Sequence, residues 1–331
     1  MPAQPVPAPV KVAVTELEYH KAEAVFRDAA GLDCIPVPIP EAGLAAAIRE
    51  TGARHAIISA QPYRDELYRA LKPGAVLARF GVGHDGVDKQ KATAAGILCT
   101  NTPCVLDQSV AEHTMLLIGE AARHLTPMAA SMRALQWAPI AGVELHGRTL
   151  AVIGAGPIGR AVARIASFGY GMRVVGVDVA PRPASDGFES IGSSFEEAVR
   201  DADFVTLHIP ATPENARFLD AARIARMRRD AWLINTARGA VVHENDLYDA
   251  LASGRLAGAA LDVFEREPYV PSDPSRDLRS LPNAILTPHT GSNTAEANRR
   301  MAERALRNVA LAEAGDLAAL DLLNPAVLAQ R

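Results

Sequence analysis

The sequence predicts an α/β protein built from two doubly wound parallel sheets. Short apolar runs alternate with helical patterns along almost the whole chain, which favours parallel strands covered by helices on both faces. The chain has 331 residues, enough for two domains. Near its middle, one strand–helix–strand pattern carries a glycine-rich turn. These three observations define the expected fold class.

The first hundred residues are typical of one α/β domain. Apolar runs at residues 12–14, 35–37, 56–58, 75–78 and 97–99 are separated by helical patterns, without a complete glycine fingerprint. One residue after the fourth run the chain reads FGVGHDGVD, where Gly81, Gly83 and Gly86 leave backbone N–H groups open at a strand's carboxyl end. A ligand-binding loop and a plain turn both fit this stretch.

The central segment carries a dinucleotide fingerprint. An apolar run at residues 150–153 breaks into the turn GAGPIG, and a helical pattern follows. Gly154 allows the tight turn, Gly156 lets the backbone approach a pyrophosphate, and Gly159 lets the helix pack against the strand. Pro157 belongs to the same turn and is assigned to the cofactor site, where N–H groups at the helix N-terminus would hold phosphates. An ordinary loop is the alternative.

An acid at the end of the next strand indicates which dinucleotide is bound. The apolar run at residues 174–177 ends on Asp178, which lies 24 residues after Gly154 (178 − 154). A carboxylate at this place accepts hydrogen bonds from ribose hydroxyls and repels a 2′-phosphate, so NAD is favoured over NADP. Arg182 is a counter-argument, because its charge could neutralise such a phosphate.

Four further strands, at residues 204–207, 231–235, 259–263 and 284–286, each end at polar side chains. Ligand chemistry in open α/β sheets gathers at the carboxyl ends of strands. We therefore expect a site built from these clusters, namely His208 and Thr212, Asn235 with Arg238, Asp262 with Glu267, and His289. From about residue 293 the chain is helical, with capping-box spacing between Asn293 and Glu296, and we expect this segment to pack onto the N-terminal domain.

Three of these residues suit hydride transfer to a 2-keto acid. A nicotinamide carries the hydride, so the protein must hold the carboxylate, polarise the keto oxygen and protonate it. The guanidinium of Arg238 suits the first two tasks, and His289 suits the third. Glu267 is the natural partner of His289, because a carboxylate beside an imidazole stabilises its protonated form. Asp262 could face the nicotinamide half of the cofactor or cap the next turn, and each of these residues also has an ordinary structural interpretation.

Composition excludes several other classes of function. The net charge is −4, with 49% hydrophobic and 22% charged residues, so nucleic-acid binding through bulk electrostatics is not expected. No apolar run is long enough to span a membrane, and we expect no membrane partner and no metal. The three cysteines, Cys34, Cys99 and Cys104, show no C-x-x-C spacing, which fits a reduced, cytoplasmic setting.

At these residues the sequence resembles the D-isomer-specific 2-hydroxyacid dehydrogenase family, which includes glyoxylate/hydroxypyruvate reductases, phosphoglycerate dehydrogenases and D-lactate dehydrogenases. The matching stretches follow one another from about residue 75 to 295 and read FGVGHDGVD, NTPCVLDQSVAEHT, ELHGRTLAVIGAGPIGR, LHIPATPEN, INTARGAVV, LAGAALDVFEREP and LTPHTGSNT. Cys104 departs from the family pattern, because many members have glycine there. His84 departs in the substrate loop, which leaves the substrate open.

The resemblance implies roles for individual residues. The catalytic set would be Arg238, Glu267 and His289. The substrate carboxylate would contact the backbone of Val82 and Gly83, and Arg238 and His289 would bind the substrate too. Cofactor contacts would come from Ile158, Asp178, His208, Thr212, Ala237, Asp262 and Gly291.

The resemblance also implies an architecture. A Rossmann NAD-binding domain, residues 106–292, would be inserted into a split, flavodoxin-like substrate domain made of residues 1–105 and 293–331. Two copies would pair as a homodimer.

We therefore expect an NAD-dependent dehydrogenase that transfers a hydride between NAD(H) and a small 2-keto acid or D-2-hydroxy acid of the glyoxylate, hydroxypyruvate or 3-phosphoglycerate type. Arg79 could help to hold an anionic tail of such a substrate. The alternative is an NAD(H)-sensing interaction protein, since relatives of the family serve as transcriptional corepressors. A formate or phosphite dehydrogenase would share the fold, but the formate branch lacks the glutamate partner.

Overall fold

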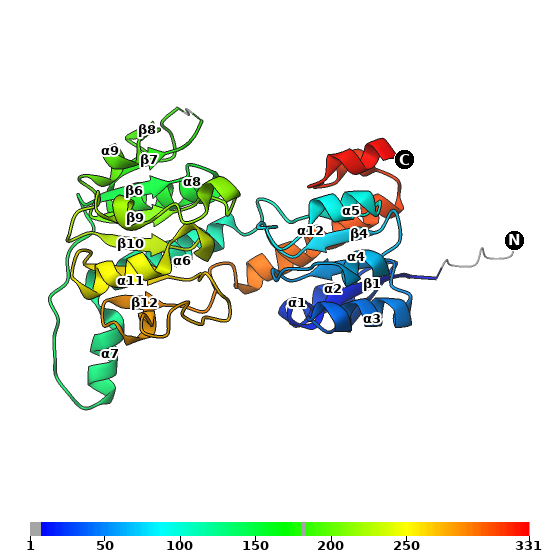
Figure 1. Cartoon of the computed structure of the whole chain (residues 1–331), viewed down its shortest axis with the longest axis horizontal. Helices are drawn as coiled ribbons and strands as arrows, with labels where there is room; N and C mark the ends of the chain where they lie inside the picture. The colour runs from blue at the N-terminus through cyan, green and yellow to red at the C-terminus, as the bar shows by residue number, and fades with distance from the viewer. Residues whose placement is uncertain (1–7, 181–182, 331) are drawn as a thin grey trace, which may run out of the picture. The chain divides into compact units, whose positions relative to one another are not determined.

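The computed structural model describes residues 8–180 and 183–330, and the described chain divides into two compact units. One unit contains the residues up to Leu106 together with those from Asn293 onward, and the other contains Asp107–Ser292. Figure 1 shows each unit as a sheet flanked by helices. None of the described helices has both the length and the apolar character needed to cross a membrane.

The first unit contains a five-stranded parallel sheet in the order β2-β1-β3-β4-β5. This is the flavodoxin-like order that was predicted. The strands are β1 (Val10–Thr15), β2 (Leu32–Val37), β3 (His55–Ile58), β4 (Val76–Arg79) and β5 (Leu98–Thr100). The helices are α1 (Glu16–Lys21), α2 (Glu23–Arg27), α3 (Glu41–Thr51), α4 (Glu66–Ala70), α5 (Lys89–Ala94) and α12 (Ala295–Glu313).

Helix α12 packs against β4 and α2, so the last segment of the chain lies on the sheet of the first unit. Its buried stripe includes Met301, Ala305 and Val309. The predicted cap is shifted by one residue, because Thr294 caps the helix through a hydrogen bond from the N–H of Ala297 (3.1 Å). Asn293 instead accepts from the side chain of Asn298.

The second unit contains a seven-stranded parallel sheet in the order β12-β11-β10-β9-β6-β7-β8, a Rossmann arrangement extended at one edge. The strands are β6 (Thr149–Ile153), β7 (Arg173–Val177), β8 (Ser190–Gly192), β9 (Phe204–Leu207), β10 (Trp232–Asn235), β11 (Gly258–Leu261) and β12 (Ala284–Leu286). The helices are α6 (Asp107–Arg123), α7 (Leu125–Arg133), α8 (Pro157–Arg164), α9 (Phe195–Val199), α10 (Ala221–Ile224) and α11 (Glu244–Ala252).

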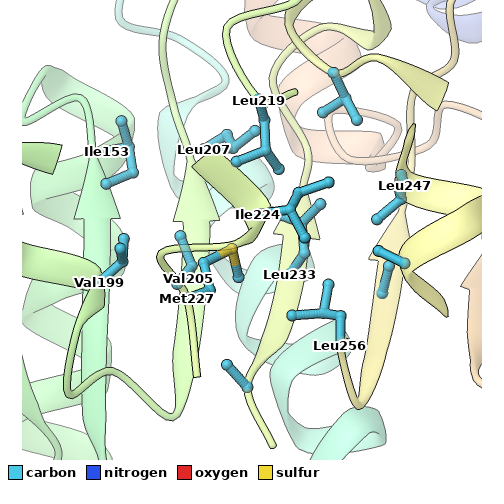
Figure 2. Packing of buried hydrophobic residues seen from close by; sticks show 14 of the residues in the cluster. Ile153, Val199, Val205, Leu207, Leu219, Ile224, Met227, Leu233, Leu247 and Leu256 are labelled. Carbon is cyan, nitrogen blue, oxygen red and sulfur yellow. The ribbon is translucent and has the colours of Figure 1, made fainter. Parts of the chain in front are cut away.

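Alternate residues of these strands face two separate apolar layers. On one face Ala151 and Ile153 pack with side chains of α9, α10 and α11, and Figure 2 shows part of this cluster. On the other face Leu150 and Val152 pack with α6 and α8. Both faces are therefore covered by helices, and only the edges and strand ends remain for ligands.

His55, at the start of β3, makes the stability of the first unit depend on pH. Its Nδ1 accepts the N–H of Val76 (2.9 Å), and its Nε2 donates to Oε1 of Glu313 (3.1 Å), so the fully buried ring is neutral. Burial lowers the pKa of His55, and Glu313 only partly offsets this. Below about pH 6.5 His55 is protonated in the unfolded chain but stays neutral in the folded protein. The free energy of unfolding therefore decreases as the pH falls from about 6.5 towards the lower pKa that His55 has in the folded protein.

We expect the free energy of unfolding of the native protein to fall between pH 7.5 and 5.5, by at most about 1.4 kcal/mol per pH unit from this group. The His55→Gln variant should lose less over the same range, because it has no proton to take up. Urea unfolding of both proteins at the two pH values measures the difference. Equal losses in the two proteins would contradict this role of His55.

Candidate active site

The predicted site residues of the second unit follow the carboxyl ends of its strands. The register aligns the last residues of the strands, namely Leu286, Leu261, Asn235, Leu207, Ile153 and Val177. The loops after these residues carry the glycine turn, Asp178, His208, Arg238, Asp262, Glu267 and His289. Arg238 and His289 follow β10 and β12, which are separated by one strand, a spacing of about 10 Å. The fold thus brings the predicted catalytic residues to the side of the sheet where the strands have their carboxyl ends.

The glycine turn has the shape that a dinucleotide requires. Gly154 has a φ of +102°, and a Cβ there would lie 2.5 Å from the carbonyl oxygen of His208. A Cβ on Gly159 would lie 2.0 Å from the carbonyl oxygen of Gly154, so the helix and strand meet in direct backbone contact. At Gly156 a Cβ would meet nothing within 4 Å, so this residue faces open space at the start of α8. Pro157 opens that helix, and these residues fit a pyrophosphate.

Asp178 lies at the rim of the glycine turn. Its Oδ2 accepts the N–H of Ala155 and its Oδ1 accepts the N–H of Ala180, both at 3.1 Å. These bonds fix the carboxylate at the end of β7, where the ribose role was predicted. Arg182, the counter-argument to NAD, lies outside the described residues.

His208 closes the other side of the turn. Its N–H donates to the carbonyl of Ile153 (2.7 Å), and its Nε2 is 3.0 Å from Oγ1 of Thr206. Burial lowers the pKa of His208 to about 3, so the ring is neutral at neutral pH. Thr212 follows in the same loop and begins the 3₁₀ turn Pro213–Asn215.

Asn235 fixes the turn that carries Arg238. Its Nδ2 donates to the carbonyl of Arg238 (2.9 Å), and its Oδ1 accepts the N–H of Ala237 (3.0 Å). Thr236 is joined to Thr114 of α6 through their hydroxyl groups (2.8 Å). The half-buried guanidinium of Arg238 donates through Nη1 to the carbonyl of Ala237 (2.7 Å). The turn is therefore held from both the strand and the helix.

Glu267 and His289 form a close pair. Oε2 of Glu267 lies 2.5 Å from Nδ1 of His289, and Oε1 accepts the N–H of Phe264 (3.1 Å). The two side chains are 35% and 32% exposed, so the pair remains accessible to a small molecule. Because Nδ1 faces the carboxylate, Nε2 is the nitrogen that can exchange a proton with a substrate.

Asp262 gathers the loop after β12 around one carboxylate. Its Oδ1 accepts hydrogen bonds from the hydroxyl of Thr287 (2.6 Å) and from the N–H of Thr290 (2.8 Å). Its Oδ2 accepts a hydrogen bond from the N–H of Gly291 (2.8 Å). Nε2 of His113 lies 3.3 Å from Oδ1. Burial alone would raise the pKa of Asp262. The hydrogen bonds from His113, Thr287, Thr290 and Gly291 outweigh this effect and hold the pKa below its usual value.

This arrangement positions His289. The N–H of His289 donates to the carbonyl of Asp262 (2.8 Å), and its φ of +51° is unusual for a residue other than glycine. The contacts of Asp262 therefore match the turn-capping interpretation, while a role beside the nicotinamide stays a prediction. The sequence alone does not single out the partners His113, Thr287 and Thr290, although all three lie within matching stretches, His113 in NTPCVLDQSVAEHT and the two threonines in LTPHTGSNT.

In the first unit, the loop after β4 presents Val82 and Gly83. The carbonyl of Val82 accepts from Nδ2 of Asn101 (2.7 Å), which holds the loop. Among the described residues the backbone N–H groups of Val82 and Gly83 have no hydrogen-bond acceptor. Arg79 is buried beneath this loop and donates to the carbonyl of Phe80. Cys104, where many members of the resembling family have glycine, has a φ of +62°.

Comparisons with known proteins identify the family that this chain resembles. The family model for the D-isomer specific 2-hydroxyacid dehydrogenase NAD binding domain matches residues 115–291. A glyoxylate reductase of Korarchaeum cryptofilum is 38% identical over 265 residues, which cover 77% of this chain and 78% of the relative. A D-3-phosphoglycerate dehydrogenase of Methanocaldococcus jannaschii is 40% identical over 242 residues, 71% of this chain and 45% of the relative.

A solved structure extends the similarity to nearly the whole chain. The NADPH-dependent glyoxylate/hydroxypyruvate reductase of Sinorhizobium meliloti, in complex with NADP and malonate, superposes with a TM-score of 0.78 at 28% identity. The match covers 92% of this chain and 93% of that one.

Among the described residues, no three His, Cys, Asp or Glu side chains gather as a metal site.

Proposed function

The chain belongs to the D-isomer specific 2-hydroxyacid dehydrogenase family and is an NAD-binding oxidoreductase of hydroxy acids, and from this premise we propose that it interconverts a small 2-keto acid and its D-2-hydroxy acid. The substrate would be of the glyoxylate, hydroxypyruvate or 3-phosphoglycerate type. The observation that carries the proposal is the Glu267–His289 pair, which lies at the same sheet edge as Arg238 and the glycine turn.

The roles follow from the chemistry of the side chains. NAD(H) supplies or accepts the hydride. In the direction of reduction, the Arg238 guanidinium polarises the keto oxygen and pairs with the carboxylate of the substrate. Nε2 of His289 gives its proton to the keto oxygen as the carbonyl carbon gains the hydride, and Glu267 stabilises the protonated imidazole before transfer. In oxidation, Nε2 of His289 takes the proton back.

We also propose that the loop after β4 in the first unit binds a carboxylate of the substrate. The N–H groups of Val82 and Gly83, which have no acceptor among the described residues, can each donate to a carboxylate oxygen. The first unit would thus be the substrate domain, and Asp107–Ser292 the NAD-binding domain. Within the latter, the glycine turn would hold the pyrophosphate, Asp178 the ribose, and Thr212, Ala237 and Gly291 would complete the cofactor site.

The experiment is a substrate panel followed by NADH absorbance. We expect oxidation of NADH by glyoxylate, hydroxypyruvate or a related 2-keto acid, and a higher kcat/KM with NADH than with NADPH because of the Asp178 carboxylate. Tight NADH binding with no turnover across the panel would contradict the proposal and favour the NAD(H)-sensing alternative. The comparisons do not favour that alternative, because the relatives described above are named as reductases and dehydrogenases.

We further propose that two copies pair through α7 and the segment after it. No residue of α7 is buried, and large apolar side chains are exposed along this stretch, including Leu135 (96%) and Trp137 (85%). Figure 1 shows α7 reaching away from the sheet of its unit. A patch of this kind is typical of a protein interface, and a two-fold dimer uses the same patch on both copies.

Light scattering after gel filtration tests the pairing. We expect the native protein to have the mass of a dimer and the double variant Leu135→Asp, Trp137→Asp to have the mass of a monomer, because the charges cannot be buried at the interface. Phe168→Asp, at an exposed apolar residue elsewhere in the unit, is the control and should remain dimeric. A monomeric native protein would contradict the proposal.

We propose that the protein works in a reduced, cytoplasmic setting. Cys34, Cys99 and Cys104 are free thiols. Burial raises the pKa of Cys34 and Cys99 to about 12, so both stay protonated and unreactive.

A further inference from the structure

The turn that carries Glu267 is held by contacts that the reaction itself does not use. Oε1 of Glu267 accepts a hydrogen bond from the N–H of Phe264, so residues 264–267 form a closed turn after β11. Two contacts fix this turn relative to Arg238, one through Gly239 and one through the carboxyl group of Glu244.

Gly239 brings the two turns into direct backbone contact. A Cβ at this position would lie 1.8 Å from the carbonyl carbon of Phe264 and 2.5 Å from the nitrogen of Glu265. The residue after Arg238 therefore touches the peptide that begins the Glu267 turn. A shift of one turn must displace the other.

Glu244 supplies a hydrogen bond at the same place. Its Oε1 accepts the N–H of Glu265 at 2.5 Å, and the residue is only 5% exposed. Glu244 begins α11, whose Leu247 and Leu251 lie in the apolar core of the unit. The acceptor is thus anchored on a rigid element, and without it a half-buried N–H would lose its partner.

The surroundings of Glu244 are acidic, so a buried carboxyl group at this position is electrostatically unfavourable. Burial raises the pKa of Glu244, and the carboxylates of Glu265 and Glu267 raise it further. An apolar side chain would avoid this electrostatic cost. A glutamate can accept the hydrogen bond from the N–H of Glu265, which an apolar side chain cannot do.

We propose that Glu244 is a positioning residue of the reaction: its carboxyl oxygen holds the Phe264–Glu267 turn against the Arg238-Gly239 turn and so keeps Glu267 in line with His289. The proposal rests on the proposed function for its kinetic consequence. The positioning requires an acceptor oxygen within hydrogen-bond distance of the N–H of Glu265, and this oxygen need not carry a charge. A displacement of about 1 Å in a catalytic group can lower the rate by about a hundredfold.

Two conservative variants separate reach from charge. Glu244→Gln keeps the oxygen in place and removes the charge, whereas Glu244→Asp keeps the charge and draws the oxygen back by one methylene. We expect Glu244→Gln to retain kcat within about threefold and Glu244→Asp to lose kcat by about 10- to 100-fold, with NADH affinity unchanged in both. The control is Asp203→Leu, which removes the acceptor for the N–H of Thr149 (2.8 Å) at the opposite edge of the sheet. It should lower stability without this loss of kcat.

Hydrogen exchange of the protein without cofactor gives a second readout that does not depend on turnover. Amides in residues 264–267 should exchange faster in Glu244→Asp than in the native protein, and Glu244→Gln should retain their protection. Unchanged exchange in Glu244→Asp, or equal losses in both variants, would overturn the proposal. If the native protein reduced no 2-keto acid, the proposed function would fail, and the exchange data would still decide whether Glu244 holds the turn.

Discussion

The His289→Ala variant is expected to lose at least about a hundredfold in kcat/KM for 2-keto acid reduction, because a positioned general acid contributes about 10²- to 10⁴-fold. Nε2 is the atom that delivers the proton, since Nδ1 is engaged with Glu267 at 2.5 Å. The loss should appear mainly in kcat, because the glycine turn and Asp178 that would bind NADH lie on other strands. Steady-state kinetics with the best substrate of the panel, together with an NADH titration, measure both effects.

An exposed histidine–carboxylate pair remote from the site residues in sequence provides the control. His20 lies 3.9 Å from Glu23 in the first unit, and its side chain is 69% exposed. His20→Ala should therefore retain native kinetics. Ordinary turnover by His289→Ala would show that another group donates the proton.

The Gly239→Ala variant is expected to be almost inactive. Its new Cβ would lie 1.8 Å from the carbonyl carbon of Phe264 and 2.0 Å from that carbonyl oxygen, and backbone atoms cannot yield as a flexible side chain can. The turns that carry Arg238 and Glu267 must separate, so both catalytic groups move at once. We expect a loss of about a hundredfold or more in kcat/KM, with a lower Tm.

Gly119→Ala is the matched control for this change. Gly119 lies in α6 of the same unit, and a Cβ there would meet nothing within 4 Å. This variant should keep full activity and gain about 0.5–1 kcal/mol of stability, because alanine favours a helix over glycine. Activity in Gly239→Ala comparable to that of Gly119→Ala would mean that the two turns are not coupled through this contact.

The core strands could be predicted from the sequence because strands of a doubly covered parallel sheet are continuous apolar runs. The runs at residues 150–153 and 204–207 match β6 and β9 within one residue. The exception is β8 (Ser190–Gly192), an edge strand whose partly exposed residues give no apolar run. Helix α7 was not predicted either, because none of its residues is buried and its apolar side chains face outwards.

The chemistry of the site was readable because ligand-binding groups gather at strand ends, so Arg238, Glu267 and His289 could be selected by position and type. Their supports could not be found in this way. The hydrogen bond from the N–H of Glu265 to Glu244 and the contact of Gly239 with Phe264 join segments about 20 residues apart or more, and only the fold brings them together. No local pattern in the sequence marks such contacts.

A crystal structure of the holoenzyme with NADH and oxamate, a 2-keto-acid analogue with a carboxylate beside an amide carbonyl, tests the assignment of Arg238 and His289 as catalytic residues. We predict that Nε2 of His289 and the guanidinium of Arg238 both lie within hydrogen-bond distance of the amide carbonyl oxygen, with Glu267 still bound to Nδ1. An analogue bound with either side chain out of reach of that oxygen would contradict the assignment of the catalytic set.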